Sequence, residues 1–341
     1  MSTSGKNIPR REPSFPAISH TGFSESSDLS GILDRYGTAH KRAVVMSDYA
    51  SSVAKNKKLS RDLRYCGSLL TFRNFYTVEQ LRLHSAKFCR KHLLCPLCSI
   101  RRASRSLQSF IPKLETVLAS DPSLSPYLVT LTVKNGSDLR ERFRHIVSSI
   151  SKMTHARRNS GRYRHPFVEM AKAEGGLYSI EFKRGKNSGL WHPHVHMVWL
   201  CRDAPDARLL SEEWRKFTGD SFIVDSRPFD SHKPMATNLM EVLKYALKFS
   251  EMTVEDNWEA FEALTGRRLF SSFGALYGLQ LPDELNDPLE DMQDLPYIDL
   301  LYRYLPKSGK YSLISTEDSE DLKNETVDQW INAFIKPPKL I

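Results

Sequence analysis

Histidines occupy alternate positions at the start of an apolar segment, Trp191 to Leu200, and this pattern restricts how the chain can fold. Because successive residues of a β-strand point to opposite faces, His192, His194 and His196 share one face of the predicted strand. Two neighbouring imidazoles on one face supply half of a site for a divalent metal ion. We therefore expect His194 and His196 to be metal ligands, the alternative being histidines that bind no metal.

The surrounding sequence alternates between strand and helix patterns. We predict strands at 127–134, 177–183, 192–200 and 221–225, and helices at 138–155 and 206–217. This β-α-β-β-α-β order predicts an α+β protein with a ferredoxin-like antiparallel sheet and both helices on one face. Polar residues can share the other face, which we expect to be open to a large substrate: Thr130, Thr132, Ser179, Glu181 and the three histidines.

A third metal ligand is expected from a strand next to the histidines. Glu181 is the acidic residue of strand 177–183, and the glycine-containing connection at 184–190 suits a hairpin. Two imidazoles and a carboxylate indicate Mn²⁺ or Mg²⁺ in use, although Zn²⁺ or Co²⁺ could also bind. Such an ion would polarise a phosphate that fills its open positions. We expect His192 to contact DNA or to support a ligand.

A helix predicted at 238–252 carries Tyr245, a candidate nucleophile. A phenol attacks poorly at neutral pH unless a cation stabilises the phenolate, and Lys244 and Lys248 are suitably close in sequence. Glu241, one turn earlier, is a candidate base for a second displacement. Alternatively, Tyr245 packs at a helix edge, and Glu241 completes a capping box with Asn238 at the helix start.

Four of the five cysteines cluster early in the chain, as Cys66, Cys89, Cys95 and Cys98. The Cys95-Pro-Leu-Cys98 knuckle suits tetrahedral Zn²⁺, with Cys89 and Cys66 completing the site and His84 or His92 as rival fourth ligands. Seven Lys and Arg and no acidic residue lie between Arg82 and Arg105. We therefore predict a structural zinc module that faces DNA, with a helix at 99–120 that presents Arg101, Arg102 and Arg105.

Charged residues are distributed unevenly along the chain. The first 280 residues hold 43 Lys and Arg against 27 Asp and Glu, whereas Asp283 to Asp328 holds 13 acidic and 4 basic residues. The basic surplus suits a polyanionic partner, although solubility alone could explain it. No apolar run is long enough for a membrane span and no export signal is visible, so we expect a cytoplasmic protein without membrane partners.

The motifs together resemble plasmid rolling-circle replication initiators, the Rep proteins of the HUH endonuclease superfamily. Three segments carry the resemblance in order: Tyr127–Val133, His192-Pro-His194-Val-His196, and Lys244-Tyr-Ala-Leu-Lys248. The cysteine region resembles one branch of that family. The resemblance implies metal at His194 and His196, nicking at a plasmid origin through Tyr245, a terminating role for Glu241 and a host helicase partner.

We divide the chain accordingly into a disordered tail (1–35), a zinc- and DNA-binding module with its helix (36–120), a nicking domain (121–255) and a helical, acidic extension (256–341). Two other functions fit the same residues. One is a rolling-circle transposase or mobilisation protein, although Phe249 stands where a second tyrosine would lie. The other is a non-catalytic zinc-containing DNA-binding regulator. The oligomeric state is not predicted.

Overall fold

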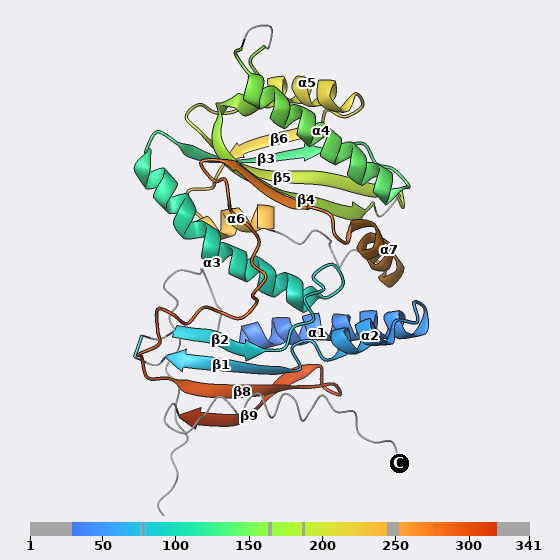
Figure 1. Cartoon of the computed structure of the whole chain (residues 1–341), viewed down its shortest axis with the longest axis vertical. Helices are drawn as coiled ribbons and strands as arrows, with labels where there is room; N and C mark the ends of the chain where they lie inside the picture. Colours follow the sequence, from blue (N-terminus) through green and yellow to red (C-terminus); the bar gives the residue numbers. More distant parts are fainter. Residues whose placement is uncertain are drawn as a thin grey trace, which may run out of the picture.

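Two antiparallel sheets, each with its own helices, form an upper and a lower lobe joined by a long helix (Figure 1). The computed structural model describes residues 29–75, 77–78, 80–162, 166–185, 188–243 and 252–318. Among these residues no helix combines the length and hydrophobicity that a bilayer span requires.

The upper sheet has the strand order β6-β3-β5-β4-β7, and neighbouring strands are antiparallel. Its strands are β3 (Ser125–Thr132), β4 (Ala173–Arg184), β5 (Trp191–Cys201), β6 (Val224–Pro228) and β7 (Phe270–Gly274). Helix α4 (Leu139–Asn159) connects β3 to β4, and α5 (Ala207–Thr218) connects β5 to β6. The six elements from β3 to β6 therefore follow the predicted order, although β6 lies three residues later than predicted and β7 was not predicted.

Asp138 and Asp206 explain where α4 and α5 begin. Each carboxylate accepts hydrogen bonds from two backbone N–H groups of the first turn, which otherwise have no partner inside the helix. Gly219 ends α5 in a left-handed conformation with φ +82°, which favours glycine at this position. Both helices pack on the same face of the sheet, against apolar side chains of β3, β4 and β5.

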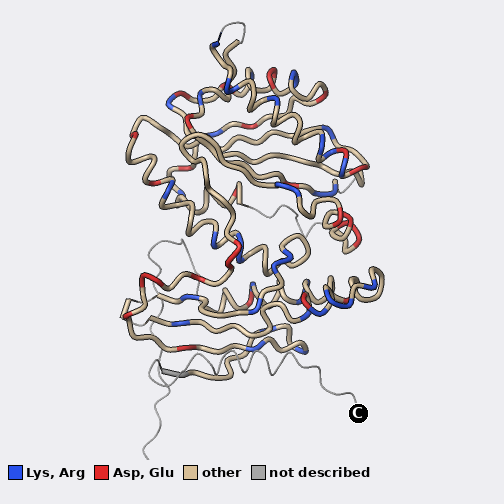
Figure 2. Tube along the Cα trace, viewed as in Figure 1, with Lys and Arg blue, Asp and Glu red and all other residues tan. Residues whose placement is uncertain are grey.

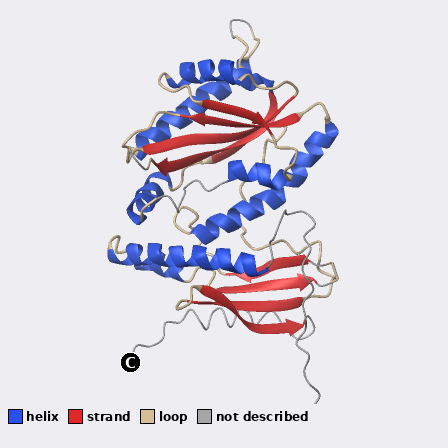
Figure 3. Ribbon diagram, turned by 180° about the vertical axis from the view of Figure 1, so that it is seen from behind, coloured by secondary structure: helices blue, strands red, loops and turns tan. Residues whose placement is uncertain are grey.

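The opposite face of the upper sheet has an apolar half at one end of its strands and a polar half at the other end. Its apolar half packs against α3 (Pro96–Ser120) and α6 (Met235–Leu243), seen from behind in Figure 3. The buried residues of this contact are Leu107, Phe110, Leu114, Leu128, Leu177, Val198, Leu200, Leu239 and Val242. The expectation of an open face is therefore wrong for this half, because the apolar residues at the far ends of the strands require a cover. The polar half carries the candidate metal ligands.

The lower lobe combines both ends of the described chain in one sheet, in the order β2-β1-β8-β9. Its strands are β1 (Leu69–Phe75), β2 (Gln80–Ala86), β8 (Ile298–Leu305) and β9 (Lys310–Asp318), and its helices are α1 (Leu29–Ser52) and α2 (Lys57–Arg64). Strand β8 pairs with β1 over six residues. Helix α7 (Val254–Leu264) precedes β7 in the chain.

Three boundary predictions need correction. The predicted tail overlaps α1, whose Leu29, Ile32 and Leu33 pack against the lower core at helical spacing. Within the described part of the predicted helical extension, 256–318, only α7 is helical, because residues 298–303 pair with β1 as a strand. Helix α3 begins at Pro96 rather than Ser99, since proline suits the first turn, and it continues through Pro112.

Candidate metal centres and basic surface

Glu181, His194 and His196 converge on the polar half of the upper sheet. Glu181 lies directly opposite His194 on the neighbouring strand, and His196 follows two residues later on the same face. The Nε2 atoms of His194 and His196 lie 3.5 and 3.2 Å from the two carboxylate oxygens of Glu181. One ligand atom from each residue lies within 4.8 Å of the others. Strand pairing therefore brings all three predicted ligands together.

The electrostatics of this group favour an ionised Glu181 carboxylate beside a neutral His194 imidazole. Glu181 is only 2% exposed, and although burial opposes its ionisation, hydrogen bonds from His194 and His196 lower the pKa of its carboxyl. Burial lowers the pKa of His194. Neutral imidazole and carboxylate are the forms that coordinate a divalent metal, so the donor set fits such an ion.

Thr130 orients the His196 ring, a role that the sequence did not reveal. Its hydroxyl lies 3.2 Å from Nδ1 of His196, directly across the β3–β5 pair, which leaves Nε2 of that ring toward Glu181. A second contact fixes His192, whose Nδ1 hydrogen-bonds with the side-chain oxygen of Asn135. The His192 ring lies edge-on to His194, with 4.7 Å between ring centroids. His192 thus supports the ligand strand without joining the group of three.

The predicted nucleophile and its neighbours, Lys244, Tyr245 and Lys248, lie outside the described residues. Helix α6, which immediately precedes them in the sequence, ends at Leu243 on the same sheet face as the metal ligands. The Ser179 hydroxyl donates a hydrogen bond to the carbonyl of Val242, and Ser179 precedes Glu181 by two residues on β4. The chain therefore leaves α6 beside the strand that carries Glu181.

The capping-box explanation of Glu241 is wrong, because α6 begins at Met235 and Asn238 lies inside it. The buried Asn238 side chain instead fastens the preceding loop. Its oxygen accepts a hydrogen bond from the Asp230 N–H, and its nitrogen donates to the Asp230 carbonyl, both at 3.0 Å. Glu241 therefore does not stand at the third helical position after a capping asparagine.

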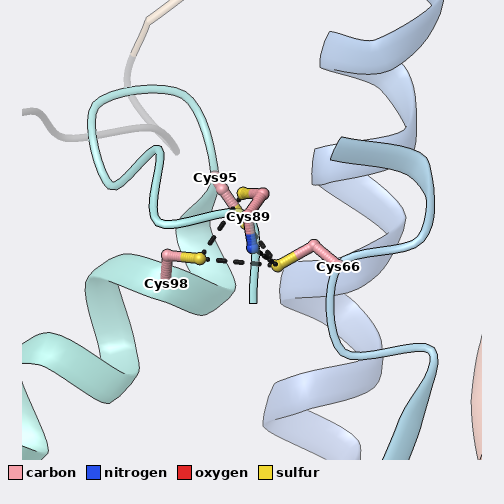
Figure 4. Close-up of side chains that lie close together, drawn as sticks. All are labelled: Cys66, Cys89, Cys95 and Cys98. Carbon is pink, nitrogen blue, oxygen red and sulfur yellow. Dashed lines mark hydrogen bonds between the residues drawn. The ribbon is translucent and has the colours of Figure 1, made fainter. Parts of the chain in front are cut away.

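The four cysteines form a second cluster, shown in Figure 4. The Sγ–Sγ distances are 3.4 Å for Cys66–Cys98 and 3.5 Å for both Cys89–Cys98 and Cys66–Cys95. Four sulfurs at about 2.3 Å from one Zn²⁺ would be separated by about 3.8 Å, close to these values. The two rival histidines, His84 and His92, do not belong to the group.

The chemistry of the cluster also fits a metal. Hydrogen bonds from the thiols of Cys66, Cys95 and Cys98 lower the pKa of Cys89, so the group gives up a first proton readily. Thiolate is the form that binds Zn²⁺. Cys66 follows α2, Cys89 and Cys95 flank the loop before α3, and Cys98 lies in its first turn. A bound ion would therefore join α2 to the start of α3.

Arg101 is not an exposed DNA contact, which corrects the prediction for this position. Its side chain is 5% exposed and forms an ion pair of 2.6 Å with Asp287. It also donates to the Leu285 carbonyl and the Tyr36 hydroxyl, both at 2.9 Å. Asp287 in turn accepts a hydrogen bond from the Leu83 N–H at 2.7 Å. Arg101 therefore fastens three distant segments inside the lower lobe.

The acid-rich connection from 283 to 294 runs between the two sheets to β8 and passes the basic residues of the cysteine region (Figure 2). Glu284 lies 3.4 Å from Arg90, and Asp291 lies 4.0 Å from Arg82. Its Leu285 is buried in the lower core. The basic stretch at 82–105 is therefore partly neutralised within the fold, and of the predicted DNA contacts Arg102 and Arg105 remain half-buried on α3.

Comparison with known proteins gives one family. A family model described as "Replication protein" matches residues 80–299. The chain is 27% identical over 266 residues to "Protein rep" of Lactiplantibacillus plantarum, covering 70% of this chain and 81% of the relative. It is 24% identical over 248 residues to "Protein rep" of Streptococcus pneumoniae, covering 68% and 74% of the two chains. No solved structure matches significantly.

Proposed function

The chain belongs to the replication-protein family whose model spans residues 80–299, and from this premise we propose that it initiates plasmid rolling-circle replication by nicking one strand of origin DNA. The observation that carries this proposal is the convergence of Glu181, His194 and His196 on one face of the upper sheet. A carboxylate and two imidazoles with open positions suit a metal that acts on a phosphodiester.

The topology supports a ferredoxin-like nicking core. Strands β6, β3, β5 and β4 lie in the order fourth, first, third and second of a β-α-β-β-α-β unit, which is the arrangement of that fold. The three candidate metal ligands lie on the central strand β5, which carries His194 and His196, and on its neighbour β4, which carries Glu181. The core therefore agrees with the HUH endonuclease resemblance of the sequence, with β7 added at one edge.

The proposed reaction is a transesterification. The phenolate oxygen of Tyr245 attacks the phosphorus, the bond to the 3′ oxygen breaks, and that oxygen leaves with its electron pair and gains a proton. The products are a 5′-phosphotyrosine and a free 3′-hydroxyl, which serves as the primer. Lys248 stabilises the phenolate, and Lys244 contacts the DNA backbone. A Mn²⁺ or Mg²⁺ ion bound by Glu181, His194 and His196 would polarise the phosphate when present.

Glu241 has a separate role in this proposal. Once replication returns to the origin, its carboxylate activates water or a 3′-hydroxyl for the second displacement, which releases the covalently bound strand. The failure of the capping-box explanation removes one structural reason for a glutamate at this position. A carboxylate four residues before the tyrosine in the sequence suits such a base.

We propose that the cysteine cluster holds a structural Zn²⁺, with Cys66 as the fourth ligand. The grouping of four thiols, and the absence of His84 and His92 from that group among the described residues, support this assignment. The zinc-bearing lobe would bind origin DNA through α3, where Arg102 and Arg105 are half-buried. A host helicase is the partner that the family resemblance implies.

The test is a covalent-adduct assay. Origin-bearing supercoiled DNA is incubated with the full chain and Mn²⁺, the DNA is digested, and mass spectrometry locates any nucleotide bound to the protein. We expect the adduct on Tyr245, its loss in Tyr245→Phe, and strongly reduced nicking in Glu181→Ala. Tyr65→Phe, at an exposed tyrosine outside the upper lobe, is the matched control.

Equal nicking by Tyr245→Phe would refute the nucleophile assignment. A wild-type protein that binds origin DNA without nicking it, at any Mn²⁺ or Mg²⁺ concentration, would instead favour a DNA-binding regulator.

A further inference from the structure

A cleft of about 810 Å³ lies between α3 and the β4–β7 edge of the upper sheet. Its lining comes from the start of α3, the residues after α7, strand β7 and the turn at 277–283. The volume falls within the range of small-molecule and nucleotide sites. The cleft is distinct from the Glu181 group, which does not line it.

Arginines dominate the charge of this cleft. Arg102, Arg267 and Arg268 line it, against one acidic residue, Asp283. Gly266, with φ +75°, turns the chain after α7 and leads the two exposed arginines directly into β7. Arginine in a concave surface suits phosphate groups, because its planar guanidinium donates several hydrogen bonds.

His92 holds Arg102 in the cleft without adding charge. Burial, together with the neighbouring Arg102, lowers the pKa of His92 to about 4, so its ring is neutral at pH 7. A ring nitrogen lies 2.7 Å from Nη1 of Arg102. The guanidinium is therefore positioned by its own protein before any ligand arrives.

Tyr277 lies at the same cleft and is 78% exposed, the highest value among the exposed large hydrophobic residues of the described chain. Its neighbour Leu276 is fully buried in the core between α3 and the sheet. The Tyr277 N–H donates to the Gly274 carbonyl at 2.8 Å, and Lys113 donates to the Tyr277 carbonyl at 3.3 Å. The backbone thus holds an aromatic ring outward at a fixed place.

We propose that this cleft is a subsite for single-stranded DNA, in which Tyr277 stacks on a base while Arg102, Arg267 and Arg268 bind the phosphates. Exposed aromatic rings beside a basic groove are how proteins bind single strands without reading their sequence. Ser179 lines the cleft and precedes Glu181 by two strand residues, about 7 Å. The subsite rests on the proposed function, because it would hold the strand that flanks the nick.

The test measures binding rather than nicking. The probe is a fluorescein-labelled thymidine oligonucleotide of about 16 nucleotides, within the range that single-strand sites occupy, titrated without added divalent metal. We expect Tyr277→Ala to weaken binding roughly 5- to 160-fold, because losing the ring that stacks on one base costs about 1–3 kcal/mol. Tyr277→Trp should bind as the wild type does. The control is Phe222→Ala, an exposed aromatic beside β6 at the other edge of the sheet.

The arginines are tested by salt dependence. The double variant Arg267→Ala and Arg268→Ala should flatten the slope of log affinity against log salt by about 1.4, because each phosphate contact on a single strand contributes about 0.7. The matched control pair, Arg158→Ala and Arg208→Ala, removes exposed arginines from α4 and α5, which cover the opposite sheet face. This pair should leave the slope within a few tenths of the wild type.

Three outcomes would overturn the subsite: unchanged affinity in Tyr277→Ala, equal loss in the control variants, or equal effects on a hairpin duplex of the same length. Circular dichroism of each variant excludes misfolding as the cause of weaker binding. If the wild type binds the oligonucleotide through Tyr277 yet never nicks DNA, the subsite stands and the proposed function fails. If the wild type nicks DNA and Tyr277→Ala binds the oligonucleotide normally, the proposed function stands and the subsite fails.

Discussion

Replacing Arg101 by Met should destabilise the lower lobe without a specific effect on DNA. The Arg101 and Asp287 side chains are 5% and 8% exposed, so the substitution leaves a buried carboxylate without its cation. Removing one partner of a buried ion pair costs about 3–5 kcal/mol. Unfolding entropy is about 2.1 cal/mol/K per residue, so in a chain of 341 residues each kcal/mol lowers the midpoint of thermal unfolding by about 1.4 °C, which predicts a fall of roughly 4–7 °C.

The companion variant Asp287→Asn keeps an oxygen that can accept the hydrogen bond from the Leu83 N–H. The double variant Arg101→Met with Asp287→Asn removes both charges and should recover much of the lost stability. Urea unfolding followed by circular dichroism measures all three variants, and fluorescence anisotropy measures their DNA binding. A stable Arg101→Met protein that binds DNA several-fold more weakly would show that Arg101 faces the nucleic acid, and it would refute the structural role.

Two further predictions concern the lower lobe. We expect the wild type to bind one tightly held Zn²⁺ per chain and Cys98→Ser to lose it. The control Cys201→Ala, in the upper core, should retain the ion. Elemental analysis of the purified proteins measures the zinc content of each. Burial and the nearby Arg73 lower the pKa of His84 to about 4 in the folded chain. The unfolded chain therefore binds the proton first, and stability should fall by up to about 3 kcal/mol as the pH drops from about 6.5 to 4. His84→Gln should flatten this pH dependence in urea unfolding, while the exposed His155→Gln should not.

Periodicity was sufficient to predict four of the five strands of the upper sheet, all but β7. The alternation in Trp191–Leu200 and in 127–134 identifies central strands, and Asp138 and Asp206 mark helix starts through local hydrogen bonds. The same alternation assigned Glu181 and the histidines to one face. The register that puts Glu181 opposite His194 confirmed this grouping, although periodicity alone did not specify the register.

Contacts between segments that are distant in the chain could not be predicted from the sequence pattern. Nothing local distinguishes Arg101 from its neighbour Arg102, and only the approach of Asp287 makes it a core residue. The residues of β8 show no regular alternation, and they form a strand because β1 and β9 pair with them on either side. Asn238 fits a helix cap by residue type, but its buried contacts with Asp230 belong to the helix interior.

The pairing of β1 with β8 has a consequence for synthesis on the ribosome. Phe75 and Ile298 are separated by more than two hundred residues, so at roughly 5–20 residues per second the first strand waits roughly 11–45 s for its neighbour. Strands β3 to β6 emerge within that interval and can pair with one another first. During that interval the thiols of Cys66, Cys89, Cys95 and Cys98 lie in a lower lobe that still lacks β8 and β9. A metal ion bound by these thiols would hold α2 against the start of α3 until the two late strands are synthesised.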